Sequence, residues 1–222
     1  MKKNITILTT LILFFSSLVF AEVPQEVAKL QHAWAKANYS TDSKAQQAAF
    51  EALLEQANIA VAGSPNSAAL LTWRGIINST YAGVKGGLGA MKYAKASKAD
   101  LEKALKLNDK TLQGSAYISL GILYNKVPGW PIGFGDDDKA KTLLEKGLVL
   151  NPDGIDSNYF YADFLADQNN YKEAEQYLLK AQQAPARPNR TIADKGRHQD
   201  IARLLEKVQK KLQTKTASTP FK

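Results

Sequence analysis

The sequence YISLGILY-NKVPGWPIGFGDDD-KAKTLLEKGLVLNP, residues 117–152, contains two helical patterns separated by a loop. Apolar residues recur at helical spacing in the first and third parts. The part between them is rich in Gly, Pro and aromatic residues, which are typical of a turn or loop. This stretch therefore predicts a pair of helices joined by an expanded connection, and we expect the rest of the chain to repeat that unit.

Three related segments indicate that the helical pair is repeated. They are LEKALKLND (101–109), LEKGLVLNP (144–152) and LLKAQQAPA (178–186), and their starts are separated by 43 and 34 residues. Each segment closes a helix that follows an alanine-rich or aromatic one. One helical pair cannot bury its apolar face alone, so stacked copies are expected to share a continuous core.

The repeated segments resemble the tetratricopeptide repeat (TPR) family, whose 34-residue unit carries Leu-Gly and Tyr in its first helix, Ala in its second and Pro at its exit. The matching residues are Tyr117, Leu120, Gly121, Tyr124, Ala140, Leu144, Gly147 and Pro152 in the middle copy, Tyr161, Ala162, Leu165, Ala174, Leu178 and Ala181 in the last, and Pro65, Leu71, Gly75, Leu101 and Ala104 in the first. The resemblance covers about 64–188 and implies an all-α, right-handed TPR-like solenoid.

Two of the copies are longer than the unit of the family. Seven extra residues fall near VPGWPIGFG (127–135) and ten near VKGGLGAMKY (84–93), so we expect two expanded loops between paired helices. The chain is similar in this respect to TPR-like proteins of the bacterial envelope, including T-component proteins associated with some TRAP transporters. Those proteins are commonly lipid-anchored. Because this chain has no Cys, the resemblance implies their fold and not their transport partnership.

The first 21 residues have the pattern of a secretory signal peptide. A basic start precedes an apolar run over 5–20 and a cleavage site near Ala21–Glu22. An uncleaved membrane anchor is the alternative, and the short run diluted by Ser and Thr argues against it. We therefore expect a periplasmic or secreted protein without a transmembrane span after cleavage.

The remaining chain is predicted to comprise an N-terminal helical pair (22–63), the repeats (64–188), a C-terminal capping helix (189–213) and a disordered tail (214–222). Residues 187–222 contain ten Lys or Arg and three acidic residues, whereas 22–186 are nearly neutral. A solvated helix face explains this basic segment more simply than contact with a membrane or an acidic partner. Because we expect the protein to be exported, we do not expect this basic segment to bind nucleic acid.

The TPR resemblance also implies a concave groove lined by the first helix of each pair. Carrying the register of the family onto this chain gives Thr72, Ile76, Ser79, Ile118, Ile122, Asn125, Tyr159, Asp163 and Asp167. This set is apolar in the middle copy and acidic in the last. We therefore expect it to bind an extended peptide, or a small ligand with a basic or polar end. The alternative is that an N-terminal helix or a loop fills the groove.

The insertion at 127–135 carries two aromatic residues, Trp130 and Phe134. They could form a lid over a ligand or partner, since long ordered loops tend to carry function. They could instead tuck into the solenoid and hold the insertion down, which we favour because an exposed Trp is costly. Asp136–Asp138 follow directly, and we expect them to cap the next helix, because their spacing does not fit a calcium loop.

We expect no catalytic site, cofactor or metal. The chain lacks Cys, and its two histidines, His32 and His198, have no partner at motif spacing. The glycines of 83–89 lack the end of a phosphate-binding loop. The predicted function is a scaffold that binds a protein or peptide through the groove. The alternative is a small-molecule carrier associated with envelope transport, with Trp73, Tyr81 or Trp130 in the wall of an enclosed pocket.

Overall fold

The computed structural model describes residues 24–217, and all regular secondary structure within them is helical. The elements are α1 (Gln25–Tyr39), α2 (Ser43–Gly63), α3 (Ala68–Lys85), α4 (Gly87–Leu107), the short 3-10 helix η1 (Thr111–Gly114), α5 (Ser115–Lys126), α6 (Asp137–Leu150), α7 (Ile155–Asp167), α8 (Tyr171–Gln182) and α9 (Thr191–Ala217). The all-α prediction is confirmed. The predicted signal peptide and its cleavage site lie outside the described residues.

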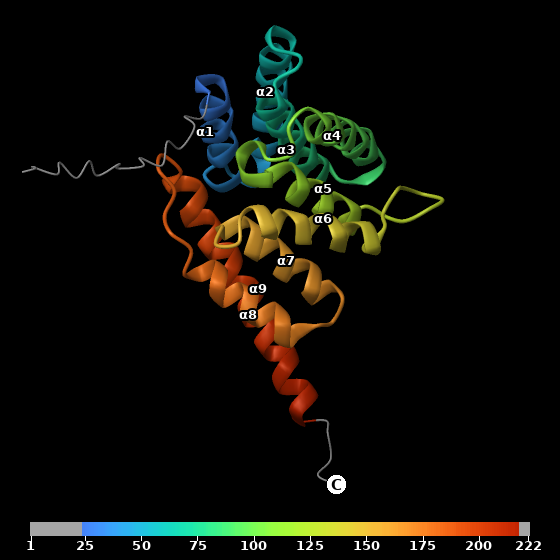
Figure 1. The fold of residues 1–222 in the computed structure, drawn as a ribbon, viewed down its shortest axis with the longest axis vertical. Helices are drawn as coiled ribbons and strands as arrows, with labels where there is room; N and C mark the ends of the chain where they lie inside the picture. Colours follow the sequence, from blue (N-terminus) through green and yellow to red (C-terminus); the bar gives the residue numbers. More distant parts are fainter. Residues whose placement is uncertain (1–23, 218–222) are drawn as a thin grey trace, which may run out of the picture.

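The helices pack as consecutive pairs, as the repeated segments predict. Helix α3 packs on α4, α5 on α6 and α7 on α8, and the second helix of each pair also contacts the first helix of the next. Figure 1 shows the pairs following one another from α1 and α2 at the top to α7 and α8 further down. First helices also contact each other in order, so α1, α3, α5, α7 and α9 form the inner layer of the array.

A small residue lies where the two helices of a pair approach most closely. A Cβ atom at Gly75 would lie 2.7 Å from Leu101 Cγ, and a Cβ atom at Gly121 would lie 2.7 Å from Leu144 Cγ. Both leucines are fully buried. The absence of a side chain at the two glycines therefore lets a leucine of the partner helix pack against the backbone, and the same contact recurs in two repeats.

The insertion at 84–93 does not form the predicted loop. Helix α3 continues to Lys85 and α4 begins at Gly87, so the extra residues lengthen both helices to 18 and 21 residues. The chain reverses at Gly86 and Gly87, whose φ angles of 61° and 60° favour glycine. The insertion contains Leu, Ala, Met and Lys, which are good helix formers, and no Pro. Because the inserted residues favour helix, they lengthen α3 and α4 and do not form a loop.

The insertion at 127–135 forms a loop, as predicted. It is closed by backbone hydrogen bonds from Gly135 N–H to Pro128 O (2.9 Å) and from Gly133 N–H to Gly129 O (3.0 Å). The Asp136 side chain then accepts a hydrogen bond from Lys139 N–H (3.0 Å) and caps α6, as predicted. Figure 1 shows this loop projecting from the side of the array.

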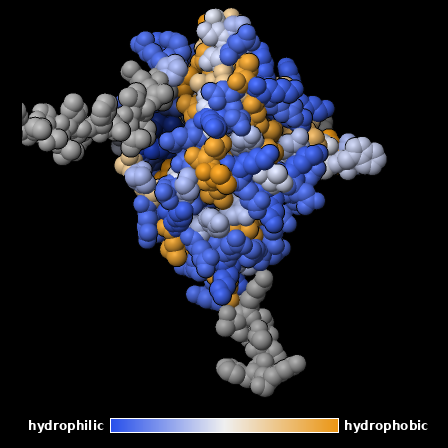
Figure 2. Space-filling view, viewed as in Figure 1, coloured by the Kyte–Doolittle hydropathy of each residue, from blue (hydrophilic) through white to orange (hydrophobic). Residues whose placement is uncertain are grey.

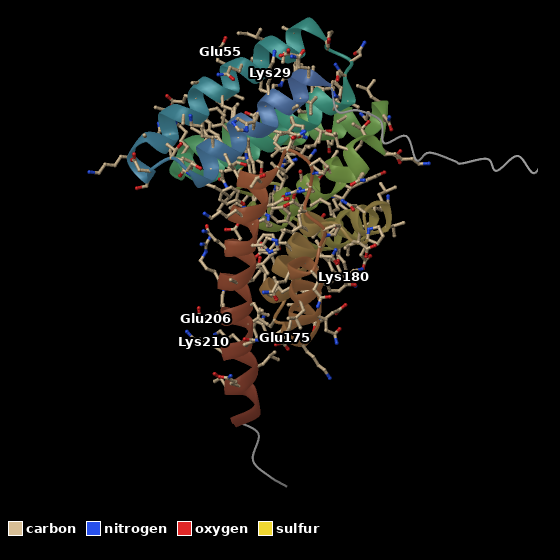
Figure 3. The ribbon with its side chains drawn as sticks, turned by 90° about the vertical axis from the view of Figure 1, so that its left-hand side faces the viewer. Lys29, Glu55, Glu175, Lys180, Glu206 and Lys210 are labelled. Carbon is tan, nitrogen blue, oxygen red and sulfur yellow. The ribbon has the colours of Figure 1, made fainter. Side chains whose placement is uncertain are left out.

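Helix α9 joins the two ends of the array. It packs on α8 and α7, and its first half also contacts α1. Figure 3 shows it running from beside α1 past the last pair, with Glu206 and Lys210 on its outer side. The helix extends to Ala217, into the segment 214–222 predicted to be disordered. It is therefore more than a terminal cap, because it also closes the array against its first helix.

Candidate functional site

Two of the predicted groove residues are not available to a ligand. Thr72 is fully buried, and its hydroxyl donates a hydrogen bond to Ala68 O within α3 (2.8 Å). Ile118 is buried against Gly147 of α6, where a Cβ atom would lie 2.2 Å from Ile118 Cδ1. These two side chains are part of the core between helices, so the register taken from the family is wrong at both positions.

Helix α9 covers other parts of the predicted groove. The Arg197 guanidinium lies 4.5 Å from the ring centroid of Tyr159, a predicted groove residue, and 4.4 Å from that of Phe160. Near the start of α9, the Arg190 guanidinium lies 5.3 Å from the ring centroid of Trp73 in α3. Arg197, within α9, thus stacks on aromatic residues of the last repeat. Arg190, just before α9, stacks on an aromatic residue of the first repeat. At Tyr159 the predicted groove is thus covered by the C-terminal helix, and not by an N-terminal helix or a loop, which was the alternative stated from the sequence.

A lysine of α5 pairs with both carboxylates at the acidic end of the predicted groove. Lys126 Nζ lies 2.8 Å from Asp163 Oδ2 and 2.5 Å from Asp167 Oδ2. The Asn125 side chain donates a hydrogen bond to Asp167 (2.8 Å). The structure therefore brings three predicted residues together, but around a lysine of α5. Because one lysine balances only one of the two carboxylate charges, this end of the groove keeps a net negative charge, and its attraction for a basic ligand stays a prediction.

Three predicted groove residues remain partly exposed without an ion pair or a covering arginine. They are Ile76, Ser79 and Ile122, on α3 and α5. Ile76 and Ile122 also pack against the core. What remains of the predicted groove is therefore a small, mainly apolar strip of the inner layer.

A network of arginines and aspartates holds α9 in place. Asp156, on α7, accepts hydrogen bonds from Arg187 (2.5 Å) and Arg197 (2.8 Å). Arg187 also donates to Asp194 at the start of α9 (2.7 Å). Although burial opposes the ionisation of Asp156, the charges of Arg197 and Arg187 hold the pKa of this carboxyl below its usual range. The carboxylate therefore stays charged and links the loop before α9 to α7.

The same network reaches the first helix of the array. Asp200 of α9 accepts hydrogen bonds from Tyr39 of α1 (2.7 Å) and Arg197 (3.0 Å), and it also pairs with Arg203. Burial raises the pKa of Tyr39 above its usual range. The Tyr39 ring packs on Gly196, where a Cβ atom would lie 2.3 Å from Tyr39 Cγ. The two ends of the array are therefore joined by the hydrogen bond from Tyr39 to Asp200 and by the packing of the Tyr39 ring on Gly196.

The aromatic residues of the projecting loop, Trp130 and Phe134, lie in opposite environments. Phe134 is partly buried and meets the Tyr124 ring edge-on, with ring centroids 5.6 Å apart. Trp130 is 90% exposed, and Ile132 beside it is 74% exposed. The preferred prediction, that both aromatic residues hold the insertion down, is correct for Phe134 and wrong for Trp130. Figure 2 shows the loop standing off the surface at the right of the view.

The base of this loop is anchored at three places. Asp136 N–H donates a hydrogen bond to Tyr124 O (3.0 Å), Phe134 packs on the Tyr124 ring, and a Cβ atom at Gly133 would lie 3.1 Å from Met91 Cε of α4. The two insertions therefore contact each other at the base of the loop. As a result, the exposed tip is held by a fixed support.

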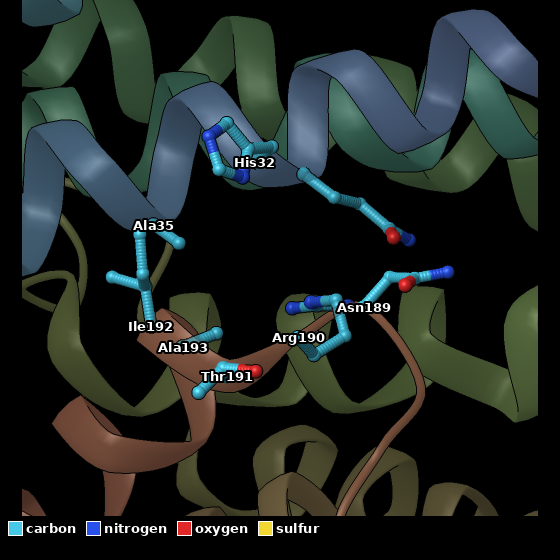
Figure 4. Close-up of a pocket in the computed structure, with 8 residues that line it drawn as sticks. His32, Ala35, Asn189, Arg190, Thr191, Ile192 and Ala193 are labelled. Atoms are coloured by element: carbon cyan, nitrogen blue, oxygen red, sulfur yellow. The ribbon is translucent and has the colours of Figure 1, made fainter.

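Two small pockets lie near the start of α9 and away from the predicted groove. One, of about 260 Å³, separates α1 from the beginning of α9 (Figure 4). The other, of about 250 Å³, is lined by residues of 184–198 and by Ile155. The aromatic residues expected in the wall of an enclosed carrier pocket are apart: Trp73 packs against Trp34, Tyr81 stacks near Phe50, and Trp130 is exposed.

The described part of the chain contains no group of three or more His, Asp or Glu side chains arranged to hold a metal ion. Within residues 24–217, no helix is both long and apolar enough to cross a membrane. The carboxylates noted from the sequence, Asp163 and Asp167, are paired with Lys126.

The buried arginines were missed by the sequence-based interpretation. Arg197 is only 7% exposed, although it lies in a segment interpreted as a solvated basic helix face. The buried apolar face of the same helix is formed by Ile201, Leu204 and Val208. A possible signal was the mixture of opposite charges in one short segment, where the arginines at 187, 190 and 197 alternate with the aspartates at 194 and 200. The charge pattern alone does not identify the aspartate of α7 that completes the network.

Solved structures share this fold at low sequence identity. The chain is similar to TTC0263, a thermophilic TPR protein of Thermus thermophilus, with a TM-score of 0.53 and 16% identity over 79% of this chain and 88% of that one. Two structures of MamA give TM-scores of 0.43 and 0.42 at 16% and 15% identity, covering 79% and 89% of this chain and 96% and 98% of theirs. No protein-family model matches the sequence, and no curated protein matches it. The chain therefore has a TPR-like fold of stacked helical pairs.

Proposed function

We propose that this protein is an exported TPR-type scaffold that binds a protein partner through the tip of the loop between α5 and α6. The observation that carries the proposal is Trp130, which is 90% exposed at the end of an anchored loop. Trp is among the residues most enriched where binding energy is concentrated in protein interfaces. A partner with an apolar recess would bury its indole ring.

The support beneath the tip favours recognition by a fixed loop. Backbone hydrogen bonds close the loop at Gly135 and Gly133, and Phe134 holds its base. Because the tip is ordered before binding, a partner does not have to offset the entropy of ordering it. Ile132 extends the apolar surface next to the indole, so two large side chains would enter the interface together.

The surroundings of the tip favour a protein partner over a lipid surface. Exposed Trp residues also occur at membrane interfaces, where nearby Lys and Arg usually accompany them. Here the loop is followed directly by Asp136, Asp137 and Asp138. Lys139 pairs with Asp136 (2.9 Å), but the other two carboxylates have no ion pair among the described residues and would be repelled by anionic headgroups. A protein partner with an apolar recess and a basic rim matches both features.

A photo-crosslinking residue placed at position 130 tests the proposal. We expect benzoylphenylalanine at this position, expressed in the native host and irradiated, to give an adduct of defined mass with one protein. The matched control carries the same residue at Val149, an apolar side chain that is 80% exposed on α6. An adduct at 130 and none at 149 would support the proposal. Equal adducts at both positions, or an adduct with lipid alone, would contradict it.

Export is part of the same proposal and has its own test. It is supported by the signal-peptide pattern of the first 21 residues. We expect the mature chain in the periplasmic or secreted fraction to begin near Glu22 when its N-terminus is sequenced. A full-length chain confined to the cytoplasm would refute export without bearing on the Trp130 contact.

A further inference from the structure

The pocket between α1 and the start of α9 has a lining that is polar on one side and apolar on the other. The lining residues are Gln31, His32, Ala35, Asn189, Arg190, Thr191, Ile192 and Ala193. Figure 4 shows Ala35, Ile192 and Ala193 gathered on one side of the hollow, with Arg190 and Asn189 on the other. At about 260 Å³, the pocket has room for a small organic molecule.

Arg190 is the arginine of this region that lacks a carboxylate. Within the described residues, four arginines (187, 190, 197 and 203) face three aspartates (156, 194 and 200), and ion pairs join every one of them except Arg190. Its Nε atom is buried and has no hydrogen-bond partner among the described residues. Burial and the charge of Arg187 lower the pKa of Arg190 to about 10, so the group remains charged at neutral pH but poorly stabilised.

Gln31 supplies a second unsatisfied polar group to the same pocket. Its side chain is only 9% exposed, and among the described residues it makes no hydrogen bond. The Gln31 amide atoms are not fully buried, so they can exchange water for a ligand in the pocket. An amide without a protein partner and a guanidinium without an ion pair therefore line one small space.

The first turn of α9 adds hydrogen-bond donors. Asp194 N–H is hydrogen-bonded to Arg190 O, whereas no hydrogen bond among the described residues uses the N–H groups of Thr191, Ile192 or Ala193. The N-terminus of a long helix carries a partial positive charge and binds anions well. These N–H groups lie in residues that line the pocket beside Arg190.

We infer that this pocket binds a small organic carboxylate with a short aliphatic body. The planar guanidinium of Arg190 and the donors at the start of α9 would hold the carboxylate, with the Gln31 amide as a further donor. The apolar side formed by Ala35, Ile192 and Ala193 would hold the aliphatic body. This apolar side distinguishes the site from one for a bare phosphate ion, which would leave it unfilled. The site lies apart from the Trp130 loop and does not depend on the function proposed above.

Titration of the 22–222 chain with sodium butyrate, followed by amide NMR, tests this inference. We expect saturable shifts at Thr191, Ile192 and Ala193. Inorganic phosphate at equal ionic strength and uncharged butyramide are the matched probes, and both should bind at least about tenfold more weakly than butyrate. Equal shifts with phosphate would overturn the carboxylate assignment, and no saturable shift with butyrate would overturn the site.

Variants identify the residue responsible. Arg190→Gln keeps a planar polar side chain but removes the charge, and we expect it to weaken butyrate binding at least about tenfold. Arg203→Gln, on the outer side of the same helix, and Trp130→Ala should bind butyrate like the parent chain. Circular dichroism checks that Arg190→Gln remains folded. Unchanged butyrate binding by a folded Arg190→Gln variant would refute the inference, whereas loss of the partner adduct at position 130 would leave it intact.

Discussion

Arg197 and Trp130 occupy the opposite environments from those their side chains suggest. The charged side chain is 7% exposed between α7 and α9, whereas the large aromatic side chain is 90% exposed at the tip of a loop. Arg197 has partners for its charge and its flat face: Asp156, Asp200 and the rings of Tyr159 and Phe160. Trp130 projects beyond its nearest support.

The difference shows that available partners decide burial as much as hydropathy does. A buried guanidinium is tolerated when carboxylates satisfy it and aromatic faces cover it. An exposed indole gains no such stabilising contacts within the chain. The loop that carries it is nevertheless anchored at its base. The first region closes the array, and the second is available for contact with another molecule.

The largest expected effect comes from breaking the buried network at Asp156. Asp156→Ala leaves the buried Arg197 without one of its carboxylates. Because the Asp156 side chain is itself 34% exposed, we expect the free energy of unfolding to fall by about 2–3 kcal/mol, which is less than for a fully buried pair. Urea unfolding measures the change. Asp153→Ala is the matched control, because Asp153 is exposed, lies just before α7 and, among the described residues, forms an ion pair with Lys180 alone. We expect the control to change stability by less than about 0.5 kcal/mol, and equal losses in the two variants would show that the network is not buried in solution.

Acid should weaken the network at Asp156 next. Because the arginines hold the pKa of Asp156 below its usual range in the folded state, its contribution is present above the ordinary carboxyl pKa, which is about 3.9. That contribution is lost as the pH falls below this value toward the folded-state pKa. The stability gap between the parent chain and Asp156→Asn should therefore narrow on acidification. A gap that stays constant from neutral to acidic pH would contradict a charged Asp156 in the folded protein.

A smaller effect is expected at the base of the loop. Phe134→Ala removes the edge-on contact with Tyr124, and because Phe134 is only partly buried we expect a loss of about 1–2 kcal/mol, less than for a fully buried Phe. Thermal unfolding is the measurement. A loss as small as that of Trp130→Ala would mean that Phe134 does not anchor the loop.

Much of the fold could be predicted from the sequence because its signals are local and repeated. The Gly75 and Gly121 positions identified the close helix crossings, and Asp136 marked the start of α6. The two insertions had similar lengths but different outcomes. Pro128 and Pro131 block a helix in the second, whereas the first contains Gly between good helix formers and joins α3 and α4.

The candidate sites were less predictable because they depend on contacts between distant segments. The groove residues followed a family register, but Ile118 packs on Gly147 and Lys126 pairs with Asp163. The return of α9 to α1 depends on Tyr39 and Asp200, which are 161 residues apart. A helical pattern specifies which face of a segment is apolar. It does not specify which distant aspartate meets which arginine.

The most direct test of the central claim compares Trp130→Ala with Ile122→Arg in co-purification from the envelope of the native host. Trp130 is almost fully exposed, so we expect its removal to change stability by less than about 0.5 kcal/mol. The account predicts that Trp130→Ala loses the partner while its melting temperature stays unchanged. Ile122→Arg, which alters the remaining strip of the predicted groove, should keep the partner if it remains folded. The opposite result would contradict the account: Trp130→Ala would keep the partner and a folded Ile122→Arg would lose it. Partner binding would then be assigned to the predicted groove.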